Sequence, residues 1–287
     1  IGAEIGVRED QLVIIAPLKE SPAEKAGLQA KDKILSIDDK PTDGLSVNDA
    51  VKLIRGEIGT KVTLAILRNG WEIPREFEIV RDEIRVPTAD WDVKEGNILH
   101  LKLYSFNENA PQQVYRALID GVTKGAEGIV IDLRNNPGGF LEIAVNIAGW
   151  FLERESLVVT EAFRDRPAIE FRSKGNGALK DFPTVVLING GSASASEILA
   201  GALRDLRKVK LIGEKSFGKG TVQELQKLKD DSSLKLTVAK WLTPAGHEIE
   251  KNGLVPDVEV KLPEKALEAD SDPQLTKAFE VLKAQIK

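Results

Sequence analysis

The sequence predicts an α/β protein, of mixed α+β composition, and two neighbouring stretches carry that prediction. Gly128-Ile129-Val130-Ile131-Asp132-Leu133 is almost entirely apolar, as expected of a strand covered on both faces, and a helical pattern over 141–152 follows it. The same unit recurs with a strand at 184–188, a helix over 196–206 and another strand at 209–213. Strands that alternate with helices favour a core built on parallel pairing.

The composition limits the classes of protein. The 287 residues suffice for one large domain or two ordinary ones, with 42% hydrophobic and 30% charged residues. A net charge of −5 gives no reason to expect nucleic acid. The absence of Cys excludes thiol catalysis, disulfides and Cys-ligated zinc, and it suits an exported protein. No apolar run approaches the length of a membrane span and no signal peptide is visible. Since the chain opens at Ile1 and lacks Met, we expect a fragment or mature form.

Residues 1–82 form one compact pattern of short elements. Local composition predicts a strand at 11–17, a short capped helix over 21–27 closed by Gly27, a strand at 32–38 with a turn at 38–41, a helix over 46–55, and strands at 62–68 and 77–80 joined by a turn at Asn69-Gly70.

That order of segments resembles a PDZ domain. The residues that carry the resemblance are S-P-A-E-K-A-G-L, D-K-I-L-S-I-D and K-V-T-L-A-I-L-R-N-G. PDZ domains capture protein C-termini by adding them as an extra strand at a sheet edge, so the resemblance implies a unit that binds protein or peptide C-termini. Lys31 departs from the pattern, because such domains usually place Gly there. The loop for the ligand's carboxylate would fall near Ile1-Gly2-Ala3.

The remaining chain divides into a core over 83–262 and a C-terminal segment over 263–287. The core opens with a strand at 98–103 and a helix over 111–123, in which Val114, Leu118 and Val122 should face inward. In the C-terminal segment, Asp272-Pro273 begins a helix with one apolar stripe, formed by Leu275, Phe279, Leu282 and Ile286.

The first chemical motif is Gly191-Ser192-Ala193-Ser194-Ala195-Ser196-Glu197, where the strand at 184–188 opens into a helix. Ser194 and Glu197 have the form of a capping box, which alone indicates a helix start. A catalytic role is compatible with it, since N–H groups and the dipole at a helix start can stabilise an oxyanion. Ser194 is therefore a candidate nucleophile.

The second motif is Gly218-Lys219-Gly220. A lysine in such a loop is ordinarily solvated, but flanking glycines let it approach another group closely. To act as a base near neutral pH, an amine must be desolvated and oriented. In an extended segment Gln223 would share a face with Lys219 and could orient it without adding charge. Ser194 and Lys219 together predict a hydrolase acting on an acyl group.

The third motif, Asn136-Pro137-Gly138-Gly139, is a strand-to-helix turn in its simplest interpretation. In an α/β sheet such turns gather at the carboxyl ends of the strands, where sites form. Backbone N–H groups of Gly138 and Gly139 could therefore bind an oxyanion opposite the N–H of Ala195.

Two further serines and two histidines are alternative nucleophiles and bases. Ser196 should lie inside the first helical turn with its hydroxyl turned aside, and Ser192 comes too early. A Ser–His hydrolase would need His100 or His247, each of which we expect to be structural or solvated.

The three motifs, placed behind a PDZ-like segment, resemble the carboxyl-terminal processing proteases, which are the S41 serine endopeptidases. The match covers essentially the whole chain, including T-P-A-G-H-E-I and G-L-V-P-D-V-E-V. The resemblance implies a PDZ domain at 1–82, a protease core of the ClpP/crotonase-like type at 83–262, and a helical segment at 263–287.

The resemblance also implies roles for single residues. Ser194 would be the nucleophile, Lys219 the general base and Gln223 the residue that orients it. The N–H of Ala195 and that of Gly138 or Gly139 would form the oxyanion hole. No metal or cofactor is implied.

The same family implies cleavage near the C-termini of unfolded or flexible proteins, and an extracytoplasmic, periplasmic or membrane-associated location in bacteria. Its members usually carry a further segment before the PDZ domain, often used in assembly, so self-association stays open. The alternative hypothesis is a non-catalytic scaffold that binds C-termini through the PDZ domain and keeps a protease-like core.

Overall fold

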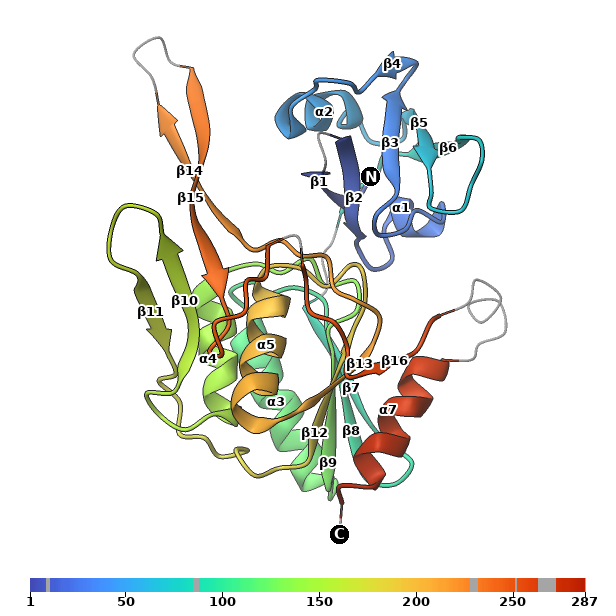
Figure 1. Ribbon diagram of the computed structural model, residues 1–287. Helices are drawn as coiled ribbons and strands as arrows, with labels where there is room; N and C mark the ends of the chain where they lie inside the picture. Colours follow the sequence, from blue (N-terminus) through green and yellow to red (C-terminus); the bar gives the residue numbers. More distant parts are fainter. Residues whose placement is uncertain (9–10, 85–87, 228–231, 251, 263–271, 287) are drawn as a thin grey trace.

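The computed structural model describes residues 1–8, 11–84, 88–227, 232–250, 252–262 and 272–286 (Figure 1). It confirms the mixed α/β architecture. An N-terminal unit, residues 1–84, lies over a larger α/β core, and a long β-hairpin rises from the core beside that unit. No helix in these described ranges is both long and apolar enough to cross a bilayer.

The N-terminal unit is an antiparallel sheet with two short helices. Its strand order is β1-β2-β3-β5-β6, with β4 beside β3, so β1 is an edge strand. The elements are β1 (Ala3–Arg8), β2 (Gln11–Pro17), α1 (Pro22–Lys25), β3 (Lys33–Ile37), β4 (Lys40–Pro41), α2 (Val47–Ile54), β5 (Lys61–Leu67) and β6 (Arg75–Val80).

Most local predictions for this unit are confirmed, with three differences. Ser21 caps α1 through its side chain, and Gly27, which follows the C-cap residue Ala26, adopts a φ of 85°. The link between β5 and β6 is longer than a two-residue turn, because Ile66 pairs with Arg75. Strands β1 and β4 were not predicted, since a strand of mixed polarity at a chain end and a two-residue strand inside a predicted turn have little local signal.

Lys31, the residue that departs from the PDZ pattern, has a φ of 73°. This left-handed backbone is the region that glycine enters most easily, which explains why glycine is usual there. Lys31 adopts it while packing against the core, where its amine donates to the backbone oxygen of Lys215 at 3.4 Å.

The core sheet has the order β16-β13-β12-β9-β8-β7. Neighbours from β16 to β8 run parallel, and β7 is antiparallel to β8. Its elements are β7 (Ala89–Lys94), β8 (Ile98–Leu103), α3 (Ala110–Thr123), β9 (Gly128–Asp132), α4 (Leu141–Phe151), β12 (Thr184–Ile188), α5 (Ala195–Arg207), β13 (Lys210–Gly213), β16 (Val258–Glu259) and α7 (Pro273–Lys283).

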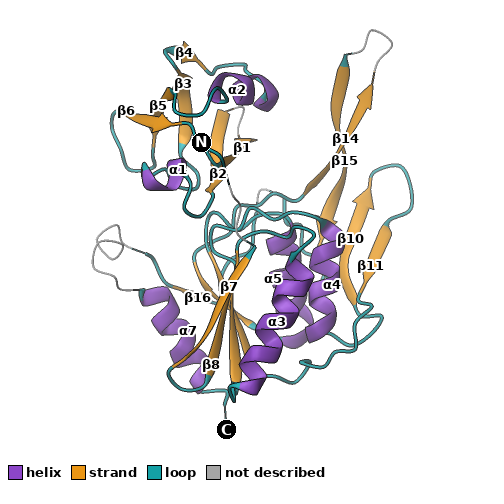
Figure 2. Cartoon of the chain, turned by 180° about the vertical axis from the view of Figure 1, so that it is seen from behind, coloured by secondary structure: helices purple, strands orange, loops and turns teal. Residues whose placement is uncertain are grey.

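Helices cover both faces of this sheet, as the near-continuous apolar strands predict. Figure 2 shows α3, α4 and α5 on one side and α7 on the other. Ile129 and Ile131 belong to the cluster beneath α3–α5, whereas Val130 belongs to the cluster beneath α7. The predicted apolar stripe of α7 packs within the chain, with Leu282 fully buried. Residues 263–271 of the C-terminal segment lie outside the described ranges.

The predicted inward face of α3 was wrong at one position. Val114 and Leu118 are buried, but Val122 is 57% exposed. Gly121 takes the inward position instead, where an added Cβ would lie 2.7 Å from the side chain of Leu99. The helix can approach the sheet this closely because the residue at the contact has no side chain.

A second sheet forms an arm on the core, with the order β11-β10-β15-β14. Its strands are β10 (Leu157–Phe163), β11 (Ile169–Arg172), β14 (Thr221–Lys227) and β15 (Ser233–Leu242), and all its neighbours are antiparallel. Strand β14 is one of its two edge strands and begins two residues after Lys219.

Candidate active site

The predicted site residues gather at one edge of the core sheet. The loop 133–140 follows β9, the turn 189–194 follows β12, and the loop 214–220 follows β13. These strands are parallel, so their carboxyl ends meet at the same edge. This edge faces the N-terminal unit (Figure 1).

Ser194 occupies a strained turn at the N-terminus of α5. Its φ is 55° and its ψ is −116°, a combination that costs a non-glycine residue roughly 1–3 kcal/mol. Hydrogen bonds on both sides hold the turn: Ala193 N–H donates to Asn136 O at 3.0 Å, and Ser194 N–H donates to Glu197 Oε2 at 2.9 Å. Such a turn projects a side chain away from the backbone, as nucleophile turns do.

The neighbouring serines have structural tasks. Ser192 Oγ donates to Leu133 O at 2.8 Å, and Ser196 Oγ donates to Asn136 O at 2.9 Å. Both side chains are fully buried, whereas Ser194 is partly exposed. Of the three serines, Ser194 alone combines a strained turn with access to solvent.

The glycine turn packs directly on the serine turn. Gly138 has a φ of 104°, and an added Cβ would lie 2.9 Å from Ser194 Cβ and 3.0 Å from Ala195 N. The N–H of Gly138 already donates to Asn136 Oδ1 at 2.9 Å. Within the described ranges, the N–H groups of Gly139 and Ala195 have no hydrogen-bond acceptor. They are the two uncommitted donors at this turn.

Glu197, on the first turn of α5, is the fully buried carboxylate of the site. It accepts hydrogen bonds from the backbone of Ser194 and of Lys219, from Gly218 N–H and from Ser216 Oγ. Burial raises the pKa of Glu197 to about 6, and these hydrogen bonds oppose the rise.

The amine of Lys219 is not bonded to Ser194. Lys219 Nζ donates to Glu4 Oε1 on β1 at 2.8 Å, and no hydrogen bond joins the side chains of Lys219 and Ser194, both of which are described. The backbones are nevertheless close. Bonds of 2.9 and 3.0 Å to the same Glu197 oxygen place the two backbone nitrogens within about 6 Å of each other.

Gln223 lies on β14 with an exposed side chain. It is described, as are Lys219 and Ser194, and no hydrogen bond joins it to either. The structure thus brings together Ser194, the glycine turn, Ala195 and the backbone of Lys219. It forms no hydrogen bond between Ser194 and either the Lys219 amine or Gln223.

The N-terminal unit contacts the core at this edge. Val13 and Ile15 of β2 form a buried apolar cluster with Ala193 and Phe217. Arg8 of β1 donates to the backbone oxygen of Phe217 at 3.1 Å and lies over its ring. The unit that carries Glu4 therefore rests on the residues adjacent to Ser194 and Lys219.

A buried ionic network holds the chain just before the glycine turn. The Arg134 guanidinium makes two hydrogen bonds to Asp132, and it also bonds to Asp272 and Gln274 at the start of α7. Burial would raise the pKa of Asp132, but the Arg134 guanidinium holds it well below its usual range. The network fixes the chain three residues before Pro137.

The histidines are placed elsewhere. His100 Nε2 lies 3.1 Å from Asp132, and His247 is largely exposed beside Asp205. Within the described part of the chain, no cluster of three or more potential ligands is placed to hold a metal ion.

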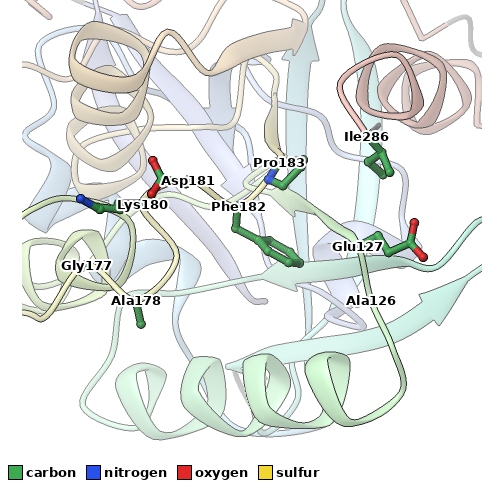
Figure 3. Close-up of a pocket in the computed structure, with 9 residues that line it drawn as sticks. All are labelled: Ala126, Glu127, Gly177, Ala178, Lys180, Asp181, Phe182, Pro183 and Ile286. Carbon is green, nitrogen blue, oxygen red and sulfur yellow. The ribbon is translucent and has the colours of Figure 1, made fainter.

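A hollow of about 640 Å³ lies at the opposite edge of the core sheet (Figure 3). Glu127 and Pro183, which line it, directly precede β9 and β12, whereas the serine and glycine turns follow these strands. The hollow therefore lies at the amino ends of the strands, away from the chemistry.

Two residues of the site were not identified from the sequence. From the sequence, Glu197 was assigned only a capping role. A carboxylate among the small and apolar residues at a helix start needs hydrogen-bond donors when it is buried, and this need could have indicated its other partners. Glu4 gave no signal, because its partner lies 215 positions away.

Comparison with known proteins gives two family matches. The model for peptidase family S41 matches residues 97–260, and the PDZ domain model matches residues 13–68. The predicted family and the predicted fold, a PDZ domain joined to an S41 protease core, are confirmed.

The similar proteins are bacterial proteases and a solved protease structure. The chain is 40% identical to a carboxy-terminal processing protease CtpA of Bacillus subtilis, covering 93% of this chain and 57% of that protein. It is 44% identical to a carboxyl-terminal-processing protease of Synechocystis sp., covering 92% and 62%. The structure of a photosystem II D1 C-terminal processing protease superposes with a TM-score of 0.85 at 32% identity, covering 91% of this chain and 72% of that one. The chain thus spans less than two thirds of these curated relatives.

Proposed function

Because the chain belongs to peptidase family S41, we propose that it is a serine endopeptidase in which Ser194 is the nucleophile and Lys219 is the general base. The observation that carries the proposal is the serine turn. It holds Ser194 in a strained backbone, partly exposed, beside two uncommitted N–H groups and within about 6 Å, backbone to backbone, of Lys219.

The reaction would proceed through an acyl-enzyme. The neutral Lys219 amine takes the proton of Ser194 Oγ while the oxygen attacks the scissile carbonyl carbon. The C–N bond then breaks, and Lys219 gives this proton to the leaving amine. A water molecule next attacks the ester, with Lys219 again taking and returning the proton, which frees Ser194.

The negative oxygen of the intermediate needs donors placed in advance. The N–H groups of Ala195 and Gly139 donate no hydrogen bond to any described residue, so both are available. Gly138, whose N–H is held by Asn136, gives the turn its close approach to Ser194. We therefore assign the oxyanion hole to Ala195 and Gly139.

Lys219 must leave Glu4 before it can act, since the amine donates to that carboxylate at 2.8 Å. The movement required is mostly a side-chain rotation, because its backbone is already fixed beside Ser194 by Glu197. In the rotated position Gln223 would orient the amine, as the family resemblance implies.

The N-terminal unit would bind the substrate. Strand β1 is an edge strand of its sheet, and an extended C-terminal segment of a flexible protein can pair with such an edge. Glu4 lies on the same strand, so capture of a C-terminus and release of Lys219 would occur at neighbouring positions.

Cleavage assays test the assignment. Ser194→Ala and Lys219→Ala should each abolish digestion of casein and retain the circular dichroism spectrum, while Lys261→Ala, at an exposed lysine of the core, should digest normally. Peptides with free and with amidated C-termini should differ in binding and in rate. Full digestion by Ser194→Ala, or binding without turnover in the wild type under all conditions, would contradict the proposal, and the second result would favour a scaffold.

We also propose an extracytoplasmic or membrane-associated location. The absence of Cys suits an exported protein, and the similar proteins are bacterial. Fractionation of the cells that produce the protein would test it. Recovery solely with cytoplasmic markers would contradict it.

A further inference from the structure

Glu197 joins the two halves of the proposed catalytic pair through a single atom. Its Oε2 accepts a hydrogen bond from Ser194 N–H at 2.9 Å and another from Lys219 N–H at 3.0 Å. The turn of Ser194 follows β12 and the loop of Lys219 follows β13, so one carboxylate oxygen spans two strand ends.

The second oxygen fixes the lysine loop. Glu197 Oε1 accepts from Gly218 N–H at 2.7 Å and from Ser216 Oγ at 2.5 Å. Ser216 Oγ in turn accepts from Leu254 N–H at 2.6 Å, which connects the carboxylate to a third segment. All four acceptor sites of the carboxylate are used, and all the donors are neutral.

No charged side chain of the described residues donates a hydrogen bond to the carboxylate. Lys31 of the N-terminal unit interacts with it electrostatically, Arg8, Glu214 and Lys215 are the charged groups around Lys31, and Lys219 reaches the carboxylate through its backbone. None of these five described side chains bonds to its oxygens, and the Lys219 amine turns to Glu4 instead. Burying a carboxylate without a cation is costly, so the geometry that it enforces must matter to the protein.

We propose that Glu197 is a positioning residue that sets the distance between Ser194 and Lys219. The proposal rests on the proposed function, because it assigns Glu197 to the alignment of that pair. An ionised carboxylate can hold both N–H groups at one oxygen and the lysine loop at the other. In a protonated carboxyl group or an amide, one of the two ends carries hydrogen and is itself a donor. That end would face two donors of the protein and could not accept from both, so the alignment of Ser194 and Lys219 would be lost.

The proposal predicts an effect on the reaction that a merely structural residue would not have. Glu197→Gln should lower kcat about 100-fold and change KM little, because misplacement of about 1 Å in a catalytic pair has effects of that size. In the wild type, acylation of Ser194 should fall more steeply with decreasing pH below about pH 6, where Glu197 takes up a proton, than it does above that pH. Glu197→Gln should lack this added steepness.

The test measures the rate at which a fluorophosphonate labels Ser194 between pH 4.5 and 9, with the labelled residue identified by mass. Wild type, Glu197→Gln and a matched control, Glu95→Gln, are compared. Glu95 is an exposed glutamate in the turn between β7 and β8. Slow labelling of Glu197→Gln with the added steepness removed supports the proposal. Labelling of Glu197→Gln at the wild-type rate and pH dependence overturns it.

A second variant keeps the test decisive if Glu197→Gln does not fold. The hydrogen bond from Ser216 lowers the pKa of Glu197, so Ser216→Ala should move the steep limb to higher pH. An unmoved limb in a folded Ser216→Ala would overturn the proposal. If the probe labels no serine in the wild type, or Ser194→Ala keeps activity, the proposed function itself is contradicted, and the role assigned to Glu197 is contradicted with it.

Discussion

The ion pair between Glu4 and Lys219 gives the sharpest prediction about control of the site. Glu4→Gln removes the carboxylate that holds the amine while preserving the shape of the side chain. Lys219 would then be free to rotate toward Ser194 more often. The variant should cleave a flexible peptide faster than the wild type at low substrate concentration.

The size of the effect follows from the geometry. At 2.8 Å, Coulomb's law in water gives about 1.5 kcal/mol for two unit charges. The side chains are 41% and 35% exposed, and measured pairs of this kind contribute about 1 kcal/mol or less. We therefore expect a rate increase of about 5-fold at most, since 1.4 kcal/mol corresponds to a factor of ten.

Salt dependence separates this cause from others. Raising the ionic strength from 0.1 to 1 M shortens the screening length from about 10 to about 3 Å, so it should accelerate the wild type and leave Glu4→Gln nearly unchanged. Initial rates on a fluorogenic peptide measure both effects, with Glu72→Gln, at an exposed glutamate of the same unit, as the control. A Glu4→Gln rate at or below that of the wild type, with the same salt dependence, would refute the reasoning.

Three other predictions follow from the residues around the site. Gly138→Ala should lower kcat at least about 100-fold in a folded protein, because its Cβ would push on Ser194; wild-type turnover would contradict the packing. Arg134→Met should lower the free energy of unfolding by about 3–5 kcal/mol, because it leaves Asp132 buried without its main partner; a loss below about 1 kcal/mol in a denaturant titration would contradict this. The folded state raises the pKa of Glu197 from 4.5 to about 6 and so binds its proton more tightly than the unfolded chain does. The stability of the wild type relative to Glu197→Gln should therefore fall by about 2 kcal/mol as the pH rises from 4 to 7, and a pH-independent difference would contradict it.

The sequence was informative where local pattern and burial agree. The apolar run before Asp132 and the small-residue turn at Ser194 predicted the parallel strands and the serine turn, since each depends on neighbours in the chain. Val122 shows the limit of periodicity. Helix α3 lies close enough to the sheet that Gly121, not Val122, faces it. The 3.6-residue pattern alone does not decide which of these two neighbouring positions is buried.

The contacts that set the state of the site are long-range. The bond from Lys219 to Glu4 depends on how the N-terminal unit rests on the core, and no local pattern near either residue encodes it. Glu197 is a different case. Its place in a capping box concealed its other hydrogen bonds, because Ser216, Gly218 and Lys219 come from a loop that the sequence does not place beside α5.

The measurement that tests the proposed Ser–Lys centre most directly is the labelling of Ser194 by a fluorophosphonate in Lys219→Ala, compared with the wild type across pH. If Lys219 accepts the proton of Ser194, the variant should label at least about 100-fold more slowly and should lose the rise of the rate with pH. Labelling of Lys219→Ala at the wild-type rate, with the same pH dependence, would contradict a lysine base in this protein.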